Sequence, residues 1–469
     1  MAFPQKNFFF FLLILSWVYI LSLACTSQLL VVHDAVNFQD LGRLVREQGW
    51  AAYLEGGPTR EPLYPFLVSL AYGSGQALGV SHISILVIFQ IAIIAISQFL
   101  LLKVLRRLRI RDTIAWLIVI YFGVSPAILN SALSGYSEIV TFPLVLGLAL
   151  AFIDGAAAVL NDNFRRTAWA GAKLGIFYFL IAMAKGTYEY IFPVFTALSL
   201  AGLGFFILKR HYFLARRLGM FIIVAVFFFY VPLTGYKLLN KHYNGHFALT
   251  HRADQIIFNS ASLRAQPITK DKIISGLASI PGQDFCTLLL TPEQCHFWTT
   301  GNLEGVGYTP EIVAVQKSLP HDEVQHFLTS QAKEQIFKHP LQFIILTAVD
   351  TVKLFFWETT HLGFVEYPDW IKNFFNAVWF QEFLRFALFG FSLAGFFYAA
   401  YFIITRRATS DPRIWILLPF LWLVTLHVGI YAVCSAVVPR HALAIAPIFL
   451  VLAAFFLENI MPKNKAGAV

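Results

Sequence analysis

Long apolar runs alternate with short polar segments along most of the chain. A helix of about 20 apolar residues crosses the hydrocarbon core of a bilayer, so each such run predicts a spanning helix. The first run is longer than the roughly 7–15 apolar residues of a signal peptide, and we interpret it as the first span. The predicted spans are 8–32, 82–102, 113–132, 138–160, 168–185, 189–208, 218–238, 383–405, 414–435 and 441–460.

Two further apolar segments are less regular. Residues 62–79 are short and interrupted by glycine and proline, whereas residues 341–357 carry Asp350 and Lys353. A crossing by 341–357 alone would move the next basic loop to the other side of the membrane. We therefore predict that both segments lie at, or dip into, the outer membrane interface. The sequence thus predicts a polytopic all-α membrane protein with about 10 spanning helices, in a range of about 10 to 13.

The charged residues agree with this topology. Hydrophobic residues make up 58% of the chain and charged residues 13%, whereas about a quarter of a soluble domain is charged. The formal net charge is +9, and basic residues gather in four segments between apolar runs, 103–111, 165–166, 209–217 and 406–413. Such segments mark the cytoplasmic side of a membrane protein. We interpret them as topology signals rather than as a nucleic-acid surface, and we place both chain ends in the cytoplasm.

Two polar segments fall on the opposite, outer side of the membrane. The first, 33–62, has the spacing of an amphipathic interfacial helix that ends at a Gly-Gly-Pro break. The second, about 240–340, is too polar for the bilayer and contains a helical run near 321–338. A loop of this length suits a small lid over a site. We therefore expect a single membrane domain over 1–469 with two outer loops.

The four cysteines give limited information. Cys25 and Cys434 lie in apolar segments and are expected to be inert. Cys286 and Cys295 lie nine positions apart in the second outer loop, where an oxidising compartment permits a disulfide. No spacing among the four resembles a zinc site.

The first outer loop carries the strongest candidates for chemistry. Asp34 follows His33 directly after the first apolar run, so its carboxylate is expected at the membrane surface. There it can cap the amphipathic helix, or act as a general base or metal ligand. Arg60 lies beside a turn that two prolines make rigid. Its guanidinium can extend towards lipid headgroups or bind the phosphate of a lipid-linked substrate.

The stretch 33–67 reads HDAVNFQDLGRLVREQGWAAYLEGGPTREPLYPFL and ends in an R-x-P-x-Y-P pattern. It resembles the first outer loop of the GT-C class of glycosyltransferases, such as the protein O-mannosyltransferases and the lipid A aminoarabinose transferases. Those multispanning enzymes use polyprenyl-phosphate sugars, and an acid in this loop is catalytic or metal-associated. The resemblance implies that role for Asp34. Ala35 and Phe38 stand where relatives often carry a second acid and a tyrosine.

Shorter segments downstream extend the resemblance. Residues 134–138, 184–186, 338–357 and 439–441 are similar to the Ser-Glu, Lys-Gly, His-Pro and Arg-aromatic segments of that class. The resemblance implies that Arg60, Lys185 and Arg440 bind the donor phosphate. Lys185 can instead extend to the headgroups, whereas Arg440 is the lone basic residue of a short outer loop. Further candidates for the site are His33, Asp40, Tyr64 and Glu138, the last of which also suits the first turn of a helix.

The function that the resemblance implies is glycosyl transfer. A sugar would pass from a polyprenyl-phosphate donor to a lipid, glycan or protein acceptor on the non-cytoplasmic side. Asp34 is expected to take the proton from the acceptor, with Glu138 and Asp40 as alternatives, and a divalent cation stays open as a cofactor. The Phe-rich spans favour a bacterial inner membrane with the site facing the periplasm. The sequence names neither the sugar nor the acceptor.

Three other functions compete with this prediction. A transporter carries paired ionisable residues deep inside its spans, whereas the acids of this chain gather near the outer surface. An O-antigen ligase or polymerase places functional Arg and His residues in a large late outer loop. This chain has His242, His246, His251 and Arg252 in such a loop, unless they only face solvent. A non-catalytic scaffold or lipid-binding subunit would tolerate the loss of Asp34 and Arg440.

Overall fold

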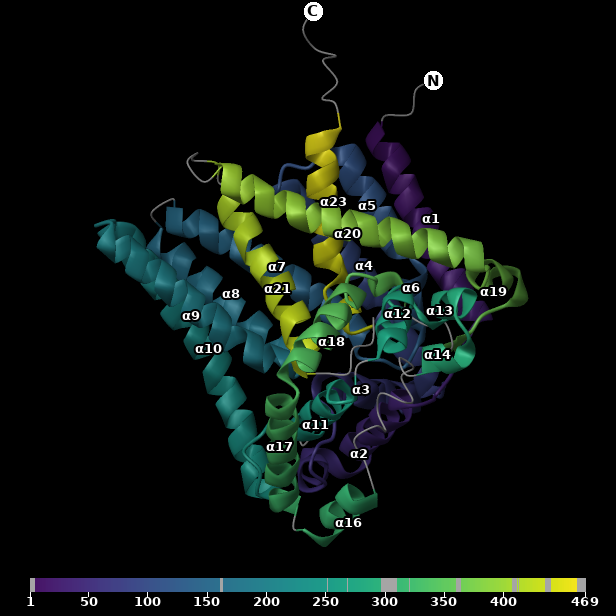
Figure 1. Ribbon diagram of the computed structural model, residues 1–469. Helices are drawn as coiled ribbons and strands as arrows, with labels where there is room; N and C mark the ends of the chain where they lie inside the picture. Colours follow the sequence, from purple (N-terminus) through teal and green to yellow (C-terminus); the bar gives the residue numbers. More distant parts are fainter. Residues whose placement is uncertain are drawn as a thin grey trace, which may run out of the picture.

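The chain folds almost entirely into helices in the computed structural model (Figure 1). The structure describes residues 5–160, 163–250, 252–267, 269–296, 310–319, 321–359, 364–406, 411, 413–434 and 440–461. The first half contains α1 (Gln5–Thr26), β1 (Gln28–Leu29), α2 (Asp34–Glu55), α3 (Leu63–Leu78), α4 (His82–Arg107), α5 (Asp112–Val124), α6 (Pro126–Leu133), α7 (Glu138–Leu160), α8 (Phe164–Ala182), α9 (Thr187–Leu208) and α10 (Tyr212–Asn244). The second half contains α11 (Ala253–Arg264), α12 (Lys270–Ala278), α13 (Gln283–Leu289), α14 (Pro292–His296), α16 (Pro310–Ser318), α17 (His321–Lys338), α18 (Pro340–Lys353), the 3-10 helix η1 (Trp357–Thr359), β2 (Val365–Glu366), α19 (Asp369–Phe375), α20 (Val378–Arg406), α21 (Arg413–Cys434), α22 (Arg440–Leu443) and α23 (Ala446–Ile460).

Seven helices in the described part of the chain are long and apolar enough to cross a membrane, namely α1, α4, α7, α9, α10, α20 and α21. Helices α5 and α6 together form an eighth candidate, which is bent by 46° where they meet. A helix satisfies its own backbone hydrogen bonds, and this makes it a stable way to cross lipid. The chain is therefore an integral membrane protein built from α-helices.

All ten predicted spans are helical, but four differ from the prediction in form. α1 ends at Thr26 rather than at residue 32, because Gln28 and Leu29 pair antiparallel with β2. The predicted span 113–132 is two helices rather than one. α8, which has basic residues in its first turn, and α23, which has only 15 residues, are not among the seven helices that meet the length and hydropathy of a full span.

The bend between α5 and α6 lies at Ser125, which is the N-cap of α6 and precedes Pro126. Proline has no backbone N–H, so it cannot continue the hydrogen bonding of α5. The buried carboxylate of Glu358 in η1 holds the bend, because it accepts a hydrogen bond from Ser125 Oγ at 2.9 Å and from the N–H of Ala127 at 3.2 Å. Burial raises the pKa of Glu358 to about 7.

Replacing Glu358 with glutamine is expected to stabilise the protein at pH 8 and to change its stability little at pH 5. The folded-state pKa of Glu358 lies above its ordinary value of 4.5, so its contribution to stability is lost as the pH rises through about 7. A shift of this size corresponds to at most about 3 kcal/mol. Glutamine keeps an oxygen acceptor at the bend and never ionises. Thermal unfolding in detergent at both pH values measures the effect, and an unchanged pH dependence in the variant would contradict it.

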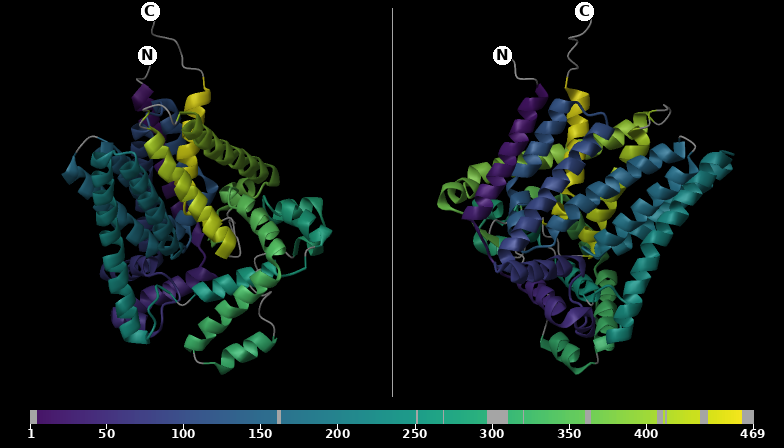
Figure 2. Two further views of the ribbon diagram at one scale, coloured as in Figure 1. Left: turned by 60° about the vertical axis from the view of Figure 1, so that its left-hand side comes forward. Right: turned by 180° about the vertical axis from the view of Figure 1, so that it is seen from behind.

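The two ends of the helical bundle differ. The start of α1 and the end of α23 lie at one end, whereas α2 and α3 lie across the other (Figures 1 and 2). At the first end, Arg111 pairs with Glu458 at 3.1 Å, and Arg107 pairs with Asp154 at 3.9 Å. The basic segment 103–111 therefore lies at the same end of the bundle as the outermost turns of α1 and α23.

Both outer loops contain helices where the sequence predicts them. α2 covers the amphipathic segment of the first loop and is followed by Gly56. In the second loop, α17 coincides with the predicted helical run at 321–338. A disulfide joins Cys286 and Cys295 and thereby links α13 to α14. α11 and α17 pack against each other through Phe258, Ala261, Val324, Leu328 and Ala332, so these two helices of the loop share a small core of their own.

The segment predicted at 341–357 forms α18, whose two charged residues are buried. Asp350 accepts a hydrogen bond from Arg264 of α11 at 2.7 Å, and Lys353 lies 3.7 Å from the same carboxylate. Arg264 also donates to the backbone oxygen of Ala432 near the end of α21. A buried ion pair thus joins α11 of the second outer loop to α18, and the same arginine attaches α11 to the membrane helix α21. The other irregular segment, 62–79, forms α3, which packs against α2 and α4.

Candidate functional site

Asp34 begins α2 with both carboxylate oxygens hydrogen-bonded. Its Oδ1 accepts from Nη2 of Arg60, and its Oδ2 accepts from Nη2 of Arg440 at 2.8 Å. The structure does not support a helix-capping role for Asp34, since His33 is the N-cap residue and its side chain makes no capping bond. Charge-assisted bonds to guanidinium groups are stronger than a neutral capping bond. The carboxylate therefore joins α2 to the turn before α3 and to α22.

The environment of Asp34 favours its ionised form. Burial by itself would raise the pKa of Asp34, but Arg440 and Arg60 outweigh burial and lower the pKa below its ordinary value. The amino end of α2 also favours a negative charge. Asp34 is therefore a carboxylate at neutral pH, and its basicity is low for as long as both arginines hold it.

The turn between α2 and α3 fixes Arg60. The hydroxyl of Tyr53 donates to the backbone oxygen of Arg60 at 2.7 Å, and the guanidinium lies 5.4 Å from the centre of the Phe38 ring. The N–H of Leu63 donates to the oxygen of Met183 at 2.9 Å, which ties the start of α3 to the end of α8. The side chain of Arg60 is 11% exposed, so it points into the protein rather than towards lipid headgroups.

Arg440 approaches the same carboxylate from the other end of the chain. Its guanidinium lies 5.0 Å from the centre of the Tyr136 ring, in the turn before α7. Burial raises the pKa of Tyr136 to about 12, so its phenol stays protonated at neutral pH. This turn approaches α2 closely, because a Cβ on Gly135 would come within 2.9 Å of the Cβ of Ala35. A larger residue at position 135 would push the turn away from Asp34.

A second ion pair lies beside the first. Lys185 Nζ is 2.9 Å from Glu138 Oε1, and the two side chains are only 15% and 5% exposed. Burial by itself would lower the pKa of Lys185, but Glu138 raises it above its ordinary value, so the ammonium stays charged. Glu61 orients the turn after α8 by accepting a hydrogen bond from the N–H of Gly186 at 2.8 Å. Lys185 also helps to lower the pKa of Asp34, so both pairs share one electrostatic environment.

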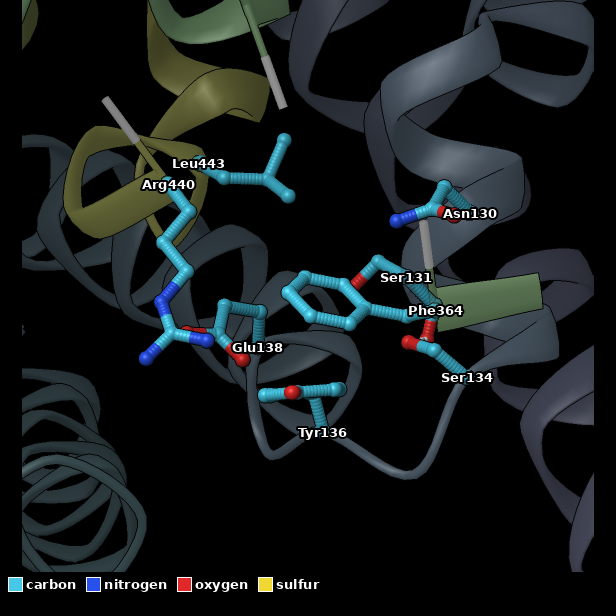
Figure 3. A pocket seen from close by; sticks show the side chains of 8 residues that line it. All are labelled: Asn130, Ser131, Ser134, Tyr136, Glu138, Phe364, Arg440 and Leu443. Carbon is cyan, nitrogen blue, oxygen red and sulfur yellow. Dashed lines mark hydrogen bonds between the residues drawn. The ribbon is translucent and has the colours of Figure 1, made fainter. Parts of the chain in front are cut away.

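A small pocket opens beside these ion pairs (Figure 3). The residues that line it are Asn130, Ser131, Ser134, Tyr136, Glu138, Phe364, Arg440 and Leu443. In Figure 3 the Phe364 ring lies between Glu138 and Ser131. Within the described ranges, Glu138 Oε2 and Ser131 Oγ are buried and have no hydrogen-bond partner. A buried polar atom without a partner costs free energy, so this pocket favours a small group that carries hydroxyl or amine hydrogens.

Five of the eight predicted site residues thus lie in three neighbouring ion pairs, two of which share Asp34. They come from five separate segments and are Asp34, Arg60, Glu138, Lys185 and Arg440. No protein-family model and no curated protein matches the chain. We refer below to these five residues together with Glu61 as the ionic cluster.

The other three candidates lie outside the ionic cluster. Asp40 is 59% exposed and pairs with Arg43 on the surface of α2, because six residues of helix turn it away from the face of Asp34. Tyr64 is buried and donates to Gln90 Oε1 at 2.7 Å. Gln90 in turn donates to backbone oxygens of the segment before α7. Tyr64 therefore helps to position the backbone that lines the pocket, without reaching the pocket itself. The ring of His33 packs edge-on against Phe364 at the edge of the pocket.

Sequence reasoning missed several residues of the site. Tyr136 lies inside the motif at 134–138, but its position beneath Arg440 depends on the approach of α22. Ser131 and Phe364 carry no local signal, since Phe364 reaches the pocket only because β2 pairs with β1. Of the loop histidines considered for a ligase, His242 is exposed on α10 and His251 lies outside the described residues. Pro439, the first residue of the motif at 439–441, also lies outside them.

The residues of the site do not fit a resident divalent cation. The described residues hold no group of three or more His, Cys, Asp or Glu side chains placed to bind a metal. Asp34 and Glu138 each face a cation of the protein, and Glu61 accepts from a backbone amide. Divalent cations prefer several oxygen ligands at once, and here arginine and lysine already neutralise the carboxylates of Asp34 and Glu138. The cation that the sequence leaves open thus has no support in the donor set.

Proposed function

We propose that this protein is a GT-C-like glycosyltransferase that uses a polyprenyl-phosphate sugar as donor and a lipid, glycan or protein as acceptor. The observation that supports the proposal is the convergence of an acid with two arginines, and of a second acid with a lysine, at the end of the bundle opposite its basic loops. A lipid-linked donor would keep its tail in the bilayer and present its phosphate at this level.

The ionic cluster supplies the groups that such a reaction needs. Arg60 and Arg440 would hold the donor phosphate, whose charge grows as the bond from the sugar to the phosphate oxygen breaks. Asp34 would take the proton from the acceptor hydroxyl or amine as that group bonds to the sugar carbon. The pocket beside Glu138 suits a hydroxyl-bearing part of the sugar or acceptor, because Glu138 Oε2 and Ser131 Oγ offer it partners.

The side of the membrane follows from charge in this proposal. The basic segments would lie in the cytoplasm, and the ionic cluster would then face the periplasm of a bacterium. The second outer loop would cover the site and select the acceptor, since α11 is attached through Arg264 to the end of α21, a few residues before Arg440.

A transporter is the second candidate, and one observation favours it. Glu189 of α9 and Lys237 of α10 form an ion pair between two membrane helices. Paired charges between spans are typical of transport paths. Glu189 lies in the first turn of α9, four residues after Lys185 of the ionic cluster, and this position also suits a charge at the headgroup level.

Incubation of the purified protein with radiolabelled polyprenyl-phosphate sugars and membrane extracts tests the proposal. We expect label to move from the donor into a product that needs both the protein and the acceptor fraction. Solute flux in vesicles without any transfer of label from a panel of donors would reject the proposal in favour of transport.

A further inference from the structure

The two arginines of the ionic cluster form an anion site that the protein's own carboxylate fills. Arg60 and Arg440 come from segments hundreds of residues apart, and each donates to a different oxygen of Asp34. Guanidinium groups bind carboxylates and phosphates with the same planar fork. A phosphate group presented at this level would therefore meet arginines that already bind an anion.

The charges of the ionic cluster balance before any other anion arrives. Its carboxylates are Asp34, Glu61 and Glu138, and its cations are Arg60, Lys185 and Arg440. A phosphodiester that bound beside Asp34 would add an uncompensated negative charge in a partly buried site, which is costly. Displacement of Asp34 from one or both arginines removes that cost, because the exposed part of its side chain, 26%, can turn towards water.

We propose that Asp34 occupies the anion site of Arg60 and Arg440 until the phosphate of the donor displaces it, and that this exchange frees Asp34 to act as the base. The inference rests on the proposed function for the identity of the phosphate carrier and for the acceptor's proton. Asp34 is a poor base while two guanidinium groups hold it, since they lower its pKa. Donor binding would thus increase the basicity of Asp34 at the stage of the reaction when the acceptor loses its proton.

The exchange closes as a cycle. The acceptor oxygen bonds to the sugar carbon, the bond from that carbon to the phosphate oxygen breaks, and the acceptor's proton moves to Asp34. The polyprenyl phosphate then leaves the arginines, and Asp34 releases its proton to water as it pairs with them again. No oxidant, reductant or further reactant is needed.

Farnesyl phosphate, a phosphate on a short isoprenoid without a sugar, is the probe that tests the exchange. If Asp34 competes for the arginines, Asp34→Asn is expected to bind farnesyl phosphate about tenfold more tightly than the unaltered protein, because one charge-assisted competitor is gone. Asp40→Asn is the matched control, since it removes the same charge from the surface of the same helix. Asp40→Asn is expected to leave the affinity for farnesyl phosphate unchanged. Farnesol, which lacks the phosphate, is expected to bind Asp34→Asn and the unaltered protein equally.

The outcomes separate this inference from its alternatives. Weaker binding by Asp34→Asn would overturn the inference, because it would mean that the acid helps to bind the phosphate. Unchanged binding would also overturn it, because it would mean that the acid does not compete for the arginines. If Asp34→Asn does not fold, a comparison of Arg60→Gln with the Arg60→Gln and Asp34→Asn double variant decides the question. The inference requires tighter binding by the double variant.

Failure of the exchange and failure of the proposed function give different results. Tighter binding by Asp34→Asn without sugar transfer from any donor would retain the anion site and reject the glycosyltransferase. Transfer by the unaltered protein without tighter binding by Asp34→Asn would retain the glycosyltransferase and reject the exchange.

Discussion

Replacing Asp34 with asparagine is expected to lower the rate of sugar transfer about 100- to 10,000-fold, the usual effect of losing a positioned general base. Asparagine keeps the size of the side chain and one oxygen for Arg60 or Arg440, but it cannot take up a proton. The variant is expected to accumulate in the membrane like the unaltered protein. Turnover of radiolabelled donor by purified protein, at saturating donor, measures the effect.

The control for this prediction is Asp40→Asn, which alters an exposed acid of α2 outside the ionic cluster and is expected to retain normal turnover. Near-normal turnover by Asp34→Asn would remove Asp34 from the reaction. Because the same variant is expected to bind the donor phosphate more tightly, its loss of activity should appear in kcat rather than as a raised KM.

The second large effect is on stability and concerns the attachment of the outer loop. Asp350→Asn removes the carboxylate that neutralises Arg264 and Lys353, whose side chains are 0% and 5% exposed. Removing one partner of a buried ion pair costs about 3–5 kcal/mol, because the remaining charge stays in a poorly solvated site. We expect a clear fall in the thermal unfolding temperature of the purified protein in detergent.

Glu334→Gln is the matched control, since it removes an acid from an ion pair of the same outer region that is open to solvent. Glu334 and Lys338 are 50% and 65% exposed, and such a pair contributes about 0–1 kcal/mol. Equal unfolding temperatures for the two variants would mean that α11 is not held to α18 through Asp350. Arg264 also donates a hydrogen bond to the end of α21, the helix that precedes Arg440 in the chain.

The ten apolar runs, the amphipathic helix of the first outer loop and the helical run of the second could be predicted because their signals are local. Each depends on the hydropathy and spacing of about 20 neighbouring residues. The exceptions have physical reasons as well. The span 113–132 is broken where Pro126 follows Ser125, and the bend is held by Glu358, a residue more than 200 positions away. A window that moves along the sequence contains no information about that partner.

The candidate site was predicted in part. The motif at 33–67 and the unexpected charge of Arg440 on an outer loop point to residues that the structure brings together, but the motifs assign them separate roles. The direct bonds from Arg60 and Arg440 to Asp34 connect these roles, because the two arginines proposed to bind the phosphate also hold the proposed base. Asp40 is a candidate in the sequence as an acid close to Asp34, and helical geometry excludes it from the ionic cluster.

Hydropathy and charge along the chain are sufficient to identify a helical membrane protein with basic segments between its spans and two polar loops opposite them. Those properties follow from composition and from periodicity over one or two turns of helix. Which charges meet depends on the packing of the helices, as in the pair of Asp34 with Arg440, 406 positions apart, and that of Arg264 with Asp350. The physical reason is that a buried charge needs a partner, whereas the choice of partner depends on how distant segments pack.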